Sequence, residues 1–358
     1  MELRYFIIRR LLLIIPTALG LTLFVFILMS AIPISSLTSP YYNPHSPIPH
    51  AEQIQKAMIL LGISPNPVIW YFHYVTNLLK GNWGIMSLQG YPSSVIDAIG
   101  LALPNTIQLD IFAVLLSVVI SIPVGTYIGS KPNSFADQFG RVFTLTGYAI
   151  PSFWLALLLQ IIFGQGVILG NPVGVFPLTG SFNPFSIPIP TPSWFTGQYT
   201  TPTHLFIFDA LLHGNIGLAW DGFMHIVLPV ITLTYGLLAG ILRFVRAGMV
   251  DNSRMDFVKT ARAKGVPEKL VIKKHVRKNA LIPTITVMGL LIAFLLNGSV
   301  VVEYVFLYPG MGFLEVNALL TQQVYGIIST TLIFGVVLMI TNLIVDIIYA
   351  MIDPRIRY

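Results

Sequence analysis

The densest cluster of charged side chains in the sequence lies between Arg243 and Pro283. This stretch, called the basic island below, holds 11 of the chain's 20 Lys and Arg residues and lies between two long apolar runs. The chemistry that such side chains offer is electrostatic attraction. The pattern indicates a cytoplasmic loop held in place by its charge, or a docking surface for a partner outside the membrane, and we expect it to be both.

The basic island has the sequence pattern of two short helices. Asp256 is placed to be the N-cap of a helix over 257–264, and Gly265 is placed to end that helix in the left-handed conformation. Pro267 and Glu268 suit the first turn of a second helix. Four cations gather toward the C-terminal end of that second helix: Lys273, Lys274, Arg277 and Lys278. The sequence therefore predicts a rigid helical elbow that projects from the membrane.

Motifs for bond-making chemistry are absent from the sequence. With no cysteine, the chain has no thiolate metal site and no cysteine nucleophile. No HExxH or GxSxG pattern occurs, so a membrane protease or esterase has little support. No phosphate-binding loop of the form GxxxxGK followed by Ser or Thr occurs either. We therefore expect no catalytic residue and no metal site in this chain, and no ATP binding by it.

A few polar groups fall inside apolar runs. Asp110 and Asp346 lie within about two turns of a predicted span end, so we interpret them as structural ion pairs or interfacial groups. Gln160 and Asn297 lie nearer mid-span. They could line a transport pathway, while hydrogen bonding between helices explains them equally well.

Composition places the chain in the membrane. It is 55% hydrophobic and 9% charged, with a mean hydropathy of +0.78, against about 25% charged residues in soluble domains. The net charge of +6 is explained by asymmetric loops, because the basic residues border apolar runs and carry no base-stacking aromatics among them. We therefore exclude nucleic acid as a partner and expect an all-α integral membrane protein.

Six apolar runs are long enough to cross a bilayer as helices, which needs about 20 residues each. They extend over about 11–32, 105–128, 142–169, 223–245, 282–302 and 327–352. Pro151 is expected to kink the third. Assigning 18 of the 20 Lys and Arg residues to one side, with both termini, satisfies the positive-inside rule, so we expect a plasma-membrane protein with cytoplasmic termini.

The spans divide the chain into parts. The expected parts are a cytoplasmic N-terminus and first span (1–32), an extracellular subdomain (33–103), a core of five spans (104–352) and a cytoplasmic tail (353–358). Within the core, 170–222 is expected to be an extracellular loop, because it holds no Lys or Arg, and 246–281 to be the cytoplasmic loop. Two short helices are expected in the subdomain, ending near Gly62 and Gly81.

The basic island also carries a resemblance. Its strings DFVKTARAKGV and HVRKNALIP resemble the cytoplasmic loop of ATP-binding-cassette (ABC) importer permeases, named for a Glu-Ala-Ala run followed at a fixed distance by Gly. Here Lys259, Thr260 and Ala261 replace that run, as in the dipeptide and oligopeptide subfamily, and Gly265 takes the glycine position. Further matching stretches lie at 103–109, 150–159, 228–233, 302–314 and 352–358. The resemblance covers essentially the whole chain in order.

The resemblance implies the type I importer permease fold, with a coupling helix that sits in a groove of an ATPase subunit. The implied coupling residues are Asp256, Phe257, Lys259, Thr260, Ala261, Lys264 and Gly265. The implied partners are a second, homologous permease subunit, two ABC ATPases that bind ATP and Mg, and an extracellular substrate-binding protein. In the family, the outer loop helps to form a gate, which here would include Glu303, Pro309, Gly310 and Gly312. A simple helix-breaking turn is the alternative for that loop.

The expected function is import of oligopeptides or dipeptides as the permease subunit. Some relatives with these motifs carry oligosaccharides or nickel, so the same machinery with an oligosaccharide substrate is an alternative. A self-contained secondary transporter is a further alternative. It is disfavoured, because the sequence shows no internal repeat and no deeply buried charge.

Overall fold

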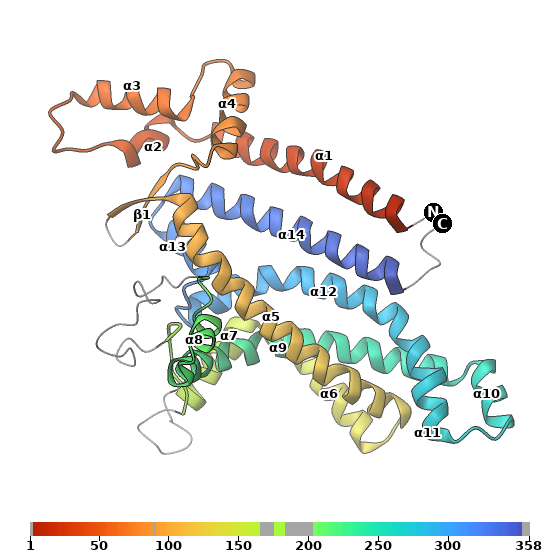
Figure 1. Cartoon of the computed structure of the whole chain (residues 1–358). Helices are drawn as coiled ribbons and strands as arrows, with labels where there is room; N and C mark the ends of the chain where they lie inside the picture. The colour runs from red at the N-terminus through yellow and green to blue at the C-terminus, as the bar shows by residue number, and fades with distance from the viewer. Residues whose placement is uncertain (1–2, 89–90, 165–174, 183–202, 353–358) are drawn as a thin grey trace. The chain divides into compact units, whose positions relative to one another are not determined.

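The computed structural model describes residues 3–88, 91–164, 175–182 and 203–352 (Figure 1). Three expectations fall outside these residues: the tail 353–358, the parts 170–174 and 183–202 of the predicted outer loop, and the side chain of Asn297. The chain forms two compact units, which are described separately. The smaller unit comprises Ile8–Thr106 and Pro309–Met339, and the larger comprises Ile107–Tyr308 and the two ends of the chain.

Four helices among the described residues are long and apolar enough to cross a membrane. They are α1 (Leu3–Ser30), α5 (Val95–Ser130), α9 (Ile216–Ser253) and α14 (Val324–Ile352). A bent pair, α6 (Phe135–Ala149) with α7 (Ser152–Leu159) and the π-helical turn Gln160–Gly164, would make a fifth. Where the fifth span of the sequence is predicted, α12 (Arg277–Val305) is one helix of 29 residues.

The third predicted span is broken more sharply than a kink. Its two halves meet at an angle of 104° at Pro151. Ile150 is extended, with ψ of 118°, and Pro151 precedes α7 with ψ of 138°. The proline ring disfavours the helical conformation of the residue before it, so the helix ends there instead of bending.

The smaller unit is built around an aromatic core. The ring of Phe26 on α1 packs edge-on against Trp70 and Tyr71 of α4 (Pro67–Leu79), with centroids 5.3 Å apart in each pair. The preceding helix α3 (His50–Leu61) ends at Gly62, whose φ is 66°, as the sequence predicts. Asn66 caps α4 by accepting hydrogen bonds from the N–H groups of two of its first residues.

Other elements complete the smaller unit. They are α2 (Ile34–Thr38), the 3₁₀ turn Ser39–Tyr41, α13 (Met311–Leu320) and the hairpin of β1 (Ile85–Leu88) and β2 (Tyr91–Ser94). The strands pair antiparallel, with Ile85 opposite Ser94. This hairpin is the exception to the all-α prediction. The region 33–103, expected to be an extracellular subdomain, shares one core with parts of α1, α13 and α14.

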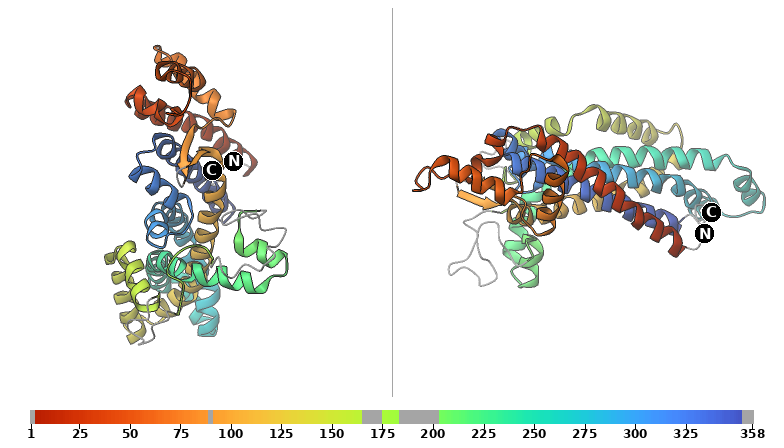
Figure 2. Two further views of the ribbon diagram at one scale, coloured as in Figure 1. Left: turned by 90° about the vertical axis from the view of Figure 1, so that its left-hand side faces the viewer. Right: turned by 90° about the horizontal axis from the view of Figure 1, so that it is seen from above.

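The larger unit is organised around α9. In the right-hand view of Figure 2, α9 and α12 run side by side over much of their length. Their close approach is explained by Gly248, because a Cβ there would lie 2.8 Å from the carbonyl oxygen of Ala280. Helix α6 and the short helix α8 (Phe206–Leu212) also pack on α9. A core that includes Leu109, Ile226 and Tyr308 joins α5, α7, α8, α9 and α12.

Candidate functional site

The basic island forms a helical elbow that connects α9 to α12. It consists of α10 (Asp256–Ala263), a turn, α11 (Glu268–Leu270) and the π-helical segment Val271–Val276, which runs into α12. In Figure 1, α10 and α11 lie beyond the ends of α9 and α12. Gly265 in the turn has φ of 76°, which confirms the left-handed end predicted from the sequence.

The elbow is held to the larger unit by its own core. Val258 and Ala261 of α10 pack with Val271 and Val276 of the π-helical segment. The same cluster includes three residues of α9 and one of α12: Ile241, Val245, Met249 and Ala280. Because these side chains are buried together, α10 cannot move far without the ends of α9 and α12 moving too.

Two ion pairs fix the elbow locally. Arg262 donates to both carboxylate oxygens of Glu268, at 2.7 and 3.0 Å, and so braces α10 against α11. The same guanidinium lowers the pKa of Glu268 below its usual value. Lys259 Nζ donates to Asp256 Oδ1 at 2.8 Å and lowers the pKa of Asp256.

The predicted capping role of Asp256 is wrong, because Met255 is the N-cap and Asp256 is the first helical residue. At that position the negative charge of an acidic side chain stabilises the helix through its dipole.

Six of the seven expected coupling residues are exposed on the elbow. They are Asp256, Phe257, Lys259, Thr260, Lys264 and Gly265. The exposed fraction of Phe257 is 41%, and its neighbour Met255 is also exposed. Ala261, the seventh, has an exposed fraction of 7% and faces the core of the elbow. The exposed face therefore presents an aromatic ring, a residue type enriched in protein interfaces, among charged and hydroxyl groups.

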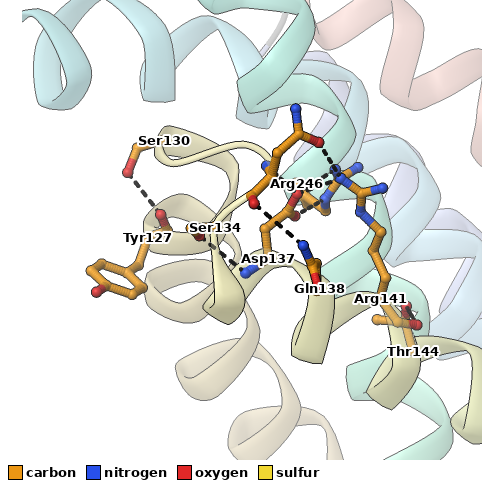
Figure 3. Close-up of polar contacts among 9 residues, drawn as sticks. Tyr127, Ser130, Ser134, Asp137, Gln138, Arg141, Thr144 and Arg246 are labelled. Carbon is orange, nitrogen blue, oxygen red and sulfur yellow. Dashed lines mark hydrogen bonds and ion pairs between the residues drawn. The ribbon is translucent and has the colours of Figure 1, made fainter.

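A buried carboxylate close to the elbow was not anticipated from the sequence. The side chain of Asp137 on α6 is fully buried and binds two guanidinium groups (Figure 3). Arg246 on α9 donates from Nε and, at 2.9 Å, from Nη2, while Arg141 donates at 2.6 Å. The backbone N–H of Asn133 donates to the same carboxylate at 2.9 Å. This arrangement, called the Asp137 clamp below, ties the start of α6 to α9 ten residues before α10 begins.

The sequence did contain signals for the Asp137 clamp. Ser134 is the N-cap of α6, and its Oγ accepts a hydrogen bond from the N–H of Asp137 at 3.2 Å. Ser followed three residues later by an acid is a helix-start pattern, and Arg141 follows Asp137 at the i+4 spacing of helical ion pairs. The partner Arg246 is 109 residues away in sequence, and local spacing cannot indicate it.

Two further acidic residues lie deep in the larger unit. Glu303 on α12 is fully buried. Both carboxylate oxygens of Asp110 on α5 are buried and have no hydrogen-bond partner in the described part of the chain. The carboxylate of Asp110 therefore forms no ion pair among the described residues, and the interfacial position remains the expected alternative. Asp110 lies four turns after the start of α5. Nearby, the fully buried Tyr308 accepts a hydrogen bond from Gln108 Nε2 at 3.3 Å.

The remaining predicted polar residues make structural contacts. Gln160 Nε2 donates to the carbonyl oxygens of Leu178 and Val305, at 2.8 and 3.2 Å. These bonds agree with the hydrogen-bonding alternative for this residue. Asp346 lies in α14, six residues before that helix ends. Among the described residues, no group of three His, Cys, Asp or Glu side chains is placed to hold a metal ion.

The predicted gate residues of the smaller unit lie where α13 begins. Gly310 is the N-cap of α13, with extended φ and ψ of −99° and −174°, and Gly312 is buried in the helix. The carbonyl oxygen of Pro309 accepts a hydrogen bond from Asn105 Nδ2 at 2.9 Å. The N–H of Met311 donates to Thr106 Oγ1 at 2.8 Å. Two side chains of α5 thus fix the turn that starts α13.

The chain is similar in sequence to known membrane transport proteins along its whole length. Residues 121–358 match the family described as "Binding-protein-dependent transport system inner membrane component". The chain is 34% identical to the oligopeptide transport system permease protein AppB of Bacillus subtilis, over 99% of each chain. It is 33% identical to the dipeptide transport system permease protein DppB of Alkalihalophilus pseudofirmus, over 98% of each. It is also 33% identical to the oligopeptide transport system permease protein OppB of Haemophilus influenzae, over 99% of each.

Proposed function

Because the chain belongs to the family of binding-protein-dependent transport system inner membrane components, we propose that it is the transmembrane permease subunit of an ABC importer for oligopeptides or dipeptides. The relatives described above are named as oligopeptide or dipeptide permeases, and their similarity extends along the full chain. No relative named there is an oligosaccharide permease, so the peptide substrate is the one that we propose.

In this proposal the chain crosses the membrane six times and both termini are cytoplasmic. The four long apolar helices and the bent pair α6–α7 account for five crossings, and α12 supplies the sixth. The asymmetry of Lys and Arg places the basic island inside the cell, and the regions 33–103 and 170–222 outside. An external binding protein delivers the peptide to these outer regions. A second, homologous permease completes the pathway between the two subunits.

The elbow is the part that receives mechanical work. Two separate ATPase subunits bind ATP and Mg, and each permease offers one elbow to a groove on an ATPase. The observation that supports this role is the combination of an exposed face bearing Phe257, Thr260 and Lys264 with a buried core shared with α9 and α12. A partner that pulls on the exposed face moves both helices, because the core transmits the displacement.

The Asp137 clamp extends this path to a third helix. Arg246 lies on the segment of α9 that leads into the elbow, and its guanidinium holds the start of α6 through Asp137. Displacement of the end of α9 therefore also displaces α6, which leads to the break at Pro151. In this proposal the outer residues Glu303, Pro309, Gly310 and Gly312 respond to that movement as part of the gate.

The proposal is tested by truncating the exposed ring of the elbow. Phe257→Ala should weaken co-purification of the ATPase subunits and reduce peptide uptake by reconstituted complexes, with the expected loss in affinity at about ten-fold or more, as for interface aromatic anchors. The matched control is Phe208→Ala on α8, because the exposed fraction of Phe208 is 48% and its position is on the other side of the membrane in the proposed topology. Equal ATPase binding by both variants, or peptide uptake by the chain without any ATPase, would contradict the proposal.

A further inference from the structure

A second group of cations lies where the elbow joins α12. Lys273, Lys274, Arg277 and Lys278, with Leu270 and Leu281, line an open groove of about 450 Å³, called the basic groove below. These cations are distinct from the proposed coupling face of α10. In the proposed function, the only role of these cations is to keep the basic island on the cytoplasmic side of the membrane.

The spacing of these residues gives the basic groove its form. Counted from Leu270, the other five residues fall at the third, fourth, seventh, eighth and eleventh positions. All six side chains line one side of this segment, and in sequence the four cations lie between the two leucines. The segment itself is anchored, because Val271, Val276 and Ala280 are buried in the core of the elbow.

The positive charge of the basic groove is not compensated within the protein. Among the described residues, none of its four cations forms an ion pair with an acidic side chain. The acidic residue closest in sequence, Glu268, is engaged by Arg262. From 269 to 302 the sequence contains no Asp or Glu. A ligand for this groove must therefore carry negative charge.

The surroundings of the groove identify the kind of anion. Leu281 is followed by the apolar run that begins with Ile282, so the cations lie at the end of a membrane helix. Basic pockets in that position suit lipid headgroups, because phosphate meets the cations while the acyl chains stay with the apolar residues. We propose that the basic groove binds the headgroup of an anionic phospholipid, with Leu270 and Leu281 against its glycerol and upper acyl region. In the orientation of the proposed function, this lipid lies in the inner leaflet.

The experiment uses the full-length chain in nanodiscs that contain phosphatidylglycerol and phosphatidylcholine. After mild extraction, native mass spectrometry counts the phosphatidylglycerol molecules retained per chain. The test variant replaces the four groove cations by Gln: Lys273→Gln, Lys274→Gln, Arg277→Gln and Lys278→Gln. The matched control removes four exposed cations elsewhere in the basic island: Arg254→Gln, Lys259→Gln, Lys264→Gln and Lys269→Gln. Both variants lose the same charge, so topology and bulk attraction are equally affected.

The wild type and the control should retain phosphatidylglycerol in preference to phosphatidylcholine. The groove variant should lose that preference by at least ten-fold, since one cation near an anionic membrane surface is worth about five-fold in binding.

Equal loss in both variants would overturn the proposal, because it would mean unspecific attraction. Displacement of the lipid by millimolar inorganic phosphate would overturn it as well. A groove variant that keeps its lipid but fails to bind the ATPases would assign the groove to a protein partner instead. Lipid retention is measured without ATPases, so failure of the coupling proposal gives a separate result.

Discussion

Arg246 on α9 donates two hydrogen bonds from its guanidinium to the fully buried carboxylate of Asp137 on α6. This contact joins residues 109 positions apart in sequence. Arg141 and the backbone of Asn133 complete the set of donors around the carboxylate. All the donors converge on one acceptor, so the clamp depends on the charge of Asp137 more than on any one partner.

Replacing Asp137 by Asn should release α6 from α9. The amide keeps the size of the side chain but leaves Arg246 without its counter-charge, and breaking a buried ion pair costs about 3 kcal/mol. We expect the variant to have a lower free energy of unfolding than the wild type. We also expect its complex to hydrolyse ATP while importing less peptide per ATP than the wild-type complex. Both are measured on reconstituted complexes. The control is Asp251→Asn, on the exposed surface of α9, the helix that carries Arg246. If the Asp137→Asn complex imports as much peptide per ATP hydrolysed as the wild type, the clamp does not transmit movement.

Replacing Gly265 by Val tests the shape of the elbow. A Cβ at this position would meet no atom within 4 Å, so the cost comes from the positive φ alone, about 1–2 kcal/mol for a residue with a side chain. We expect a reoriented turn, weaker ATPase co-purification and less peptide uptake. Gly81→Val is a close control, because Gly81 has φ of 80° and open space around it, but lies in the smaller unit. If both variants lose the ATPases equally, the effect is one of general folding and the elbow has no special role.

The brace between Arg262 and Glu268 should depend on pH. The guanidinium lowers the pKa of Glu268 below its usual 4.5, so the pair contributes stability above pH 4.5 and loses it as the pH falls through the lower pKa of the folded state. Because both side chains are about half exposed, the contribution is at most about 1 kcal/mol. Amide hydrogen exchange at residues 264–266 of the turn should be slower in the wild type than in Glu268→Gln at pH 7. This difference should vanish in strong acid, whereas a difference independent of pH would mean that the brace acts without its charge.

Replacing Asp110 by Leu should stabilise the protein. The carboxylate of Asp110 is buried without a hydrogen-bond partner, and an apolar side chain of similar size avoids that cost. We expect a gain of about 1 kcal/mol in the free energy of unfolding, measured by thermal denaturation in detergent. Asp97→Leu is the control. Asp97 is exposed in the first turn of the same helix, where an acid is favourable, so its loss should give no gain. A destabilised Asp110→Leu protein would mean that this carboxylate has an unrecognised partner.

Sequence periodicity and turn residues predicted helix ends well where neighbouring residues alone determine the end. Gly62 and Gly265 end their helices, as predicted, and the left-handed conformation predicted for Gly265 is found at both, because few other residues adopt it without strain. The apolar runs locate the spans but not their ends. For example, α5 begins at Val95, about ten residues before the predicted span, since hydropathy detects the lipid-facing part and not the helix.

Contacts between distant residues could not be predicted from the sequence. Asp137 looks like an ordinary residue of a polar turn until α9 brings Arg246 to it. Likewise, Ala261 was expected on the coupling face, but helix packing turned it inward. The hairpin of β1 and β2 was missed because its strands have four residues each, and Gln323, far along the chain, bonds the backbone of Ser87.

The contact of Gly248 with Ala280 limits how the permease core can deform. With backbone this close to backbone, α9 and α12 cannot rotate about their own axes or slip along each other without a steric clash. In the proposed mechanism, a displacement of the elbow therefore swings the two helices together as a single lever. Bending of the larger unit must then occur at another position. The break between α6 and α7 at Ile150 and Pro151 is the expected hinge, because the helical hydrogen bonds are interrupted there.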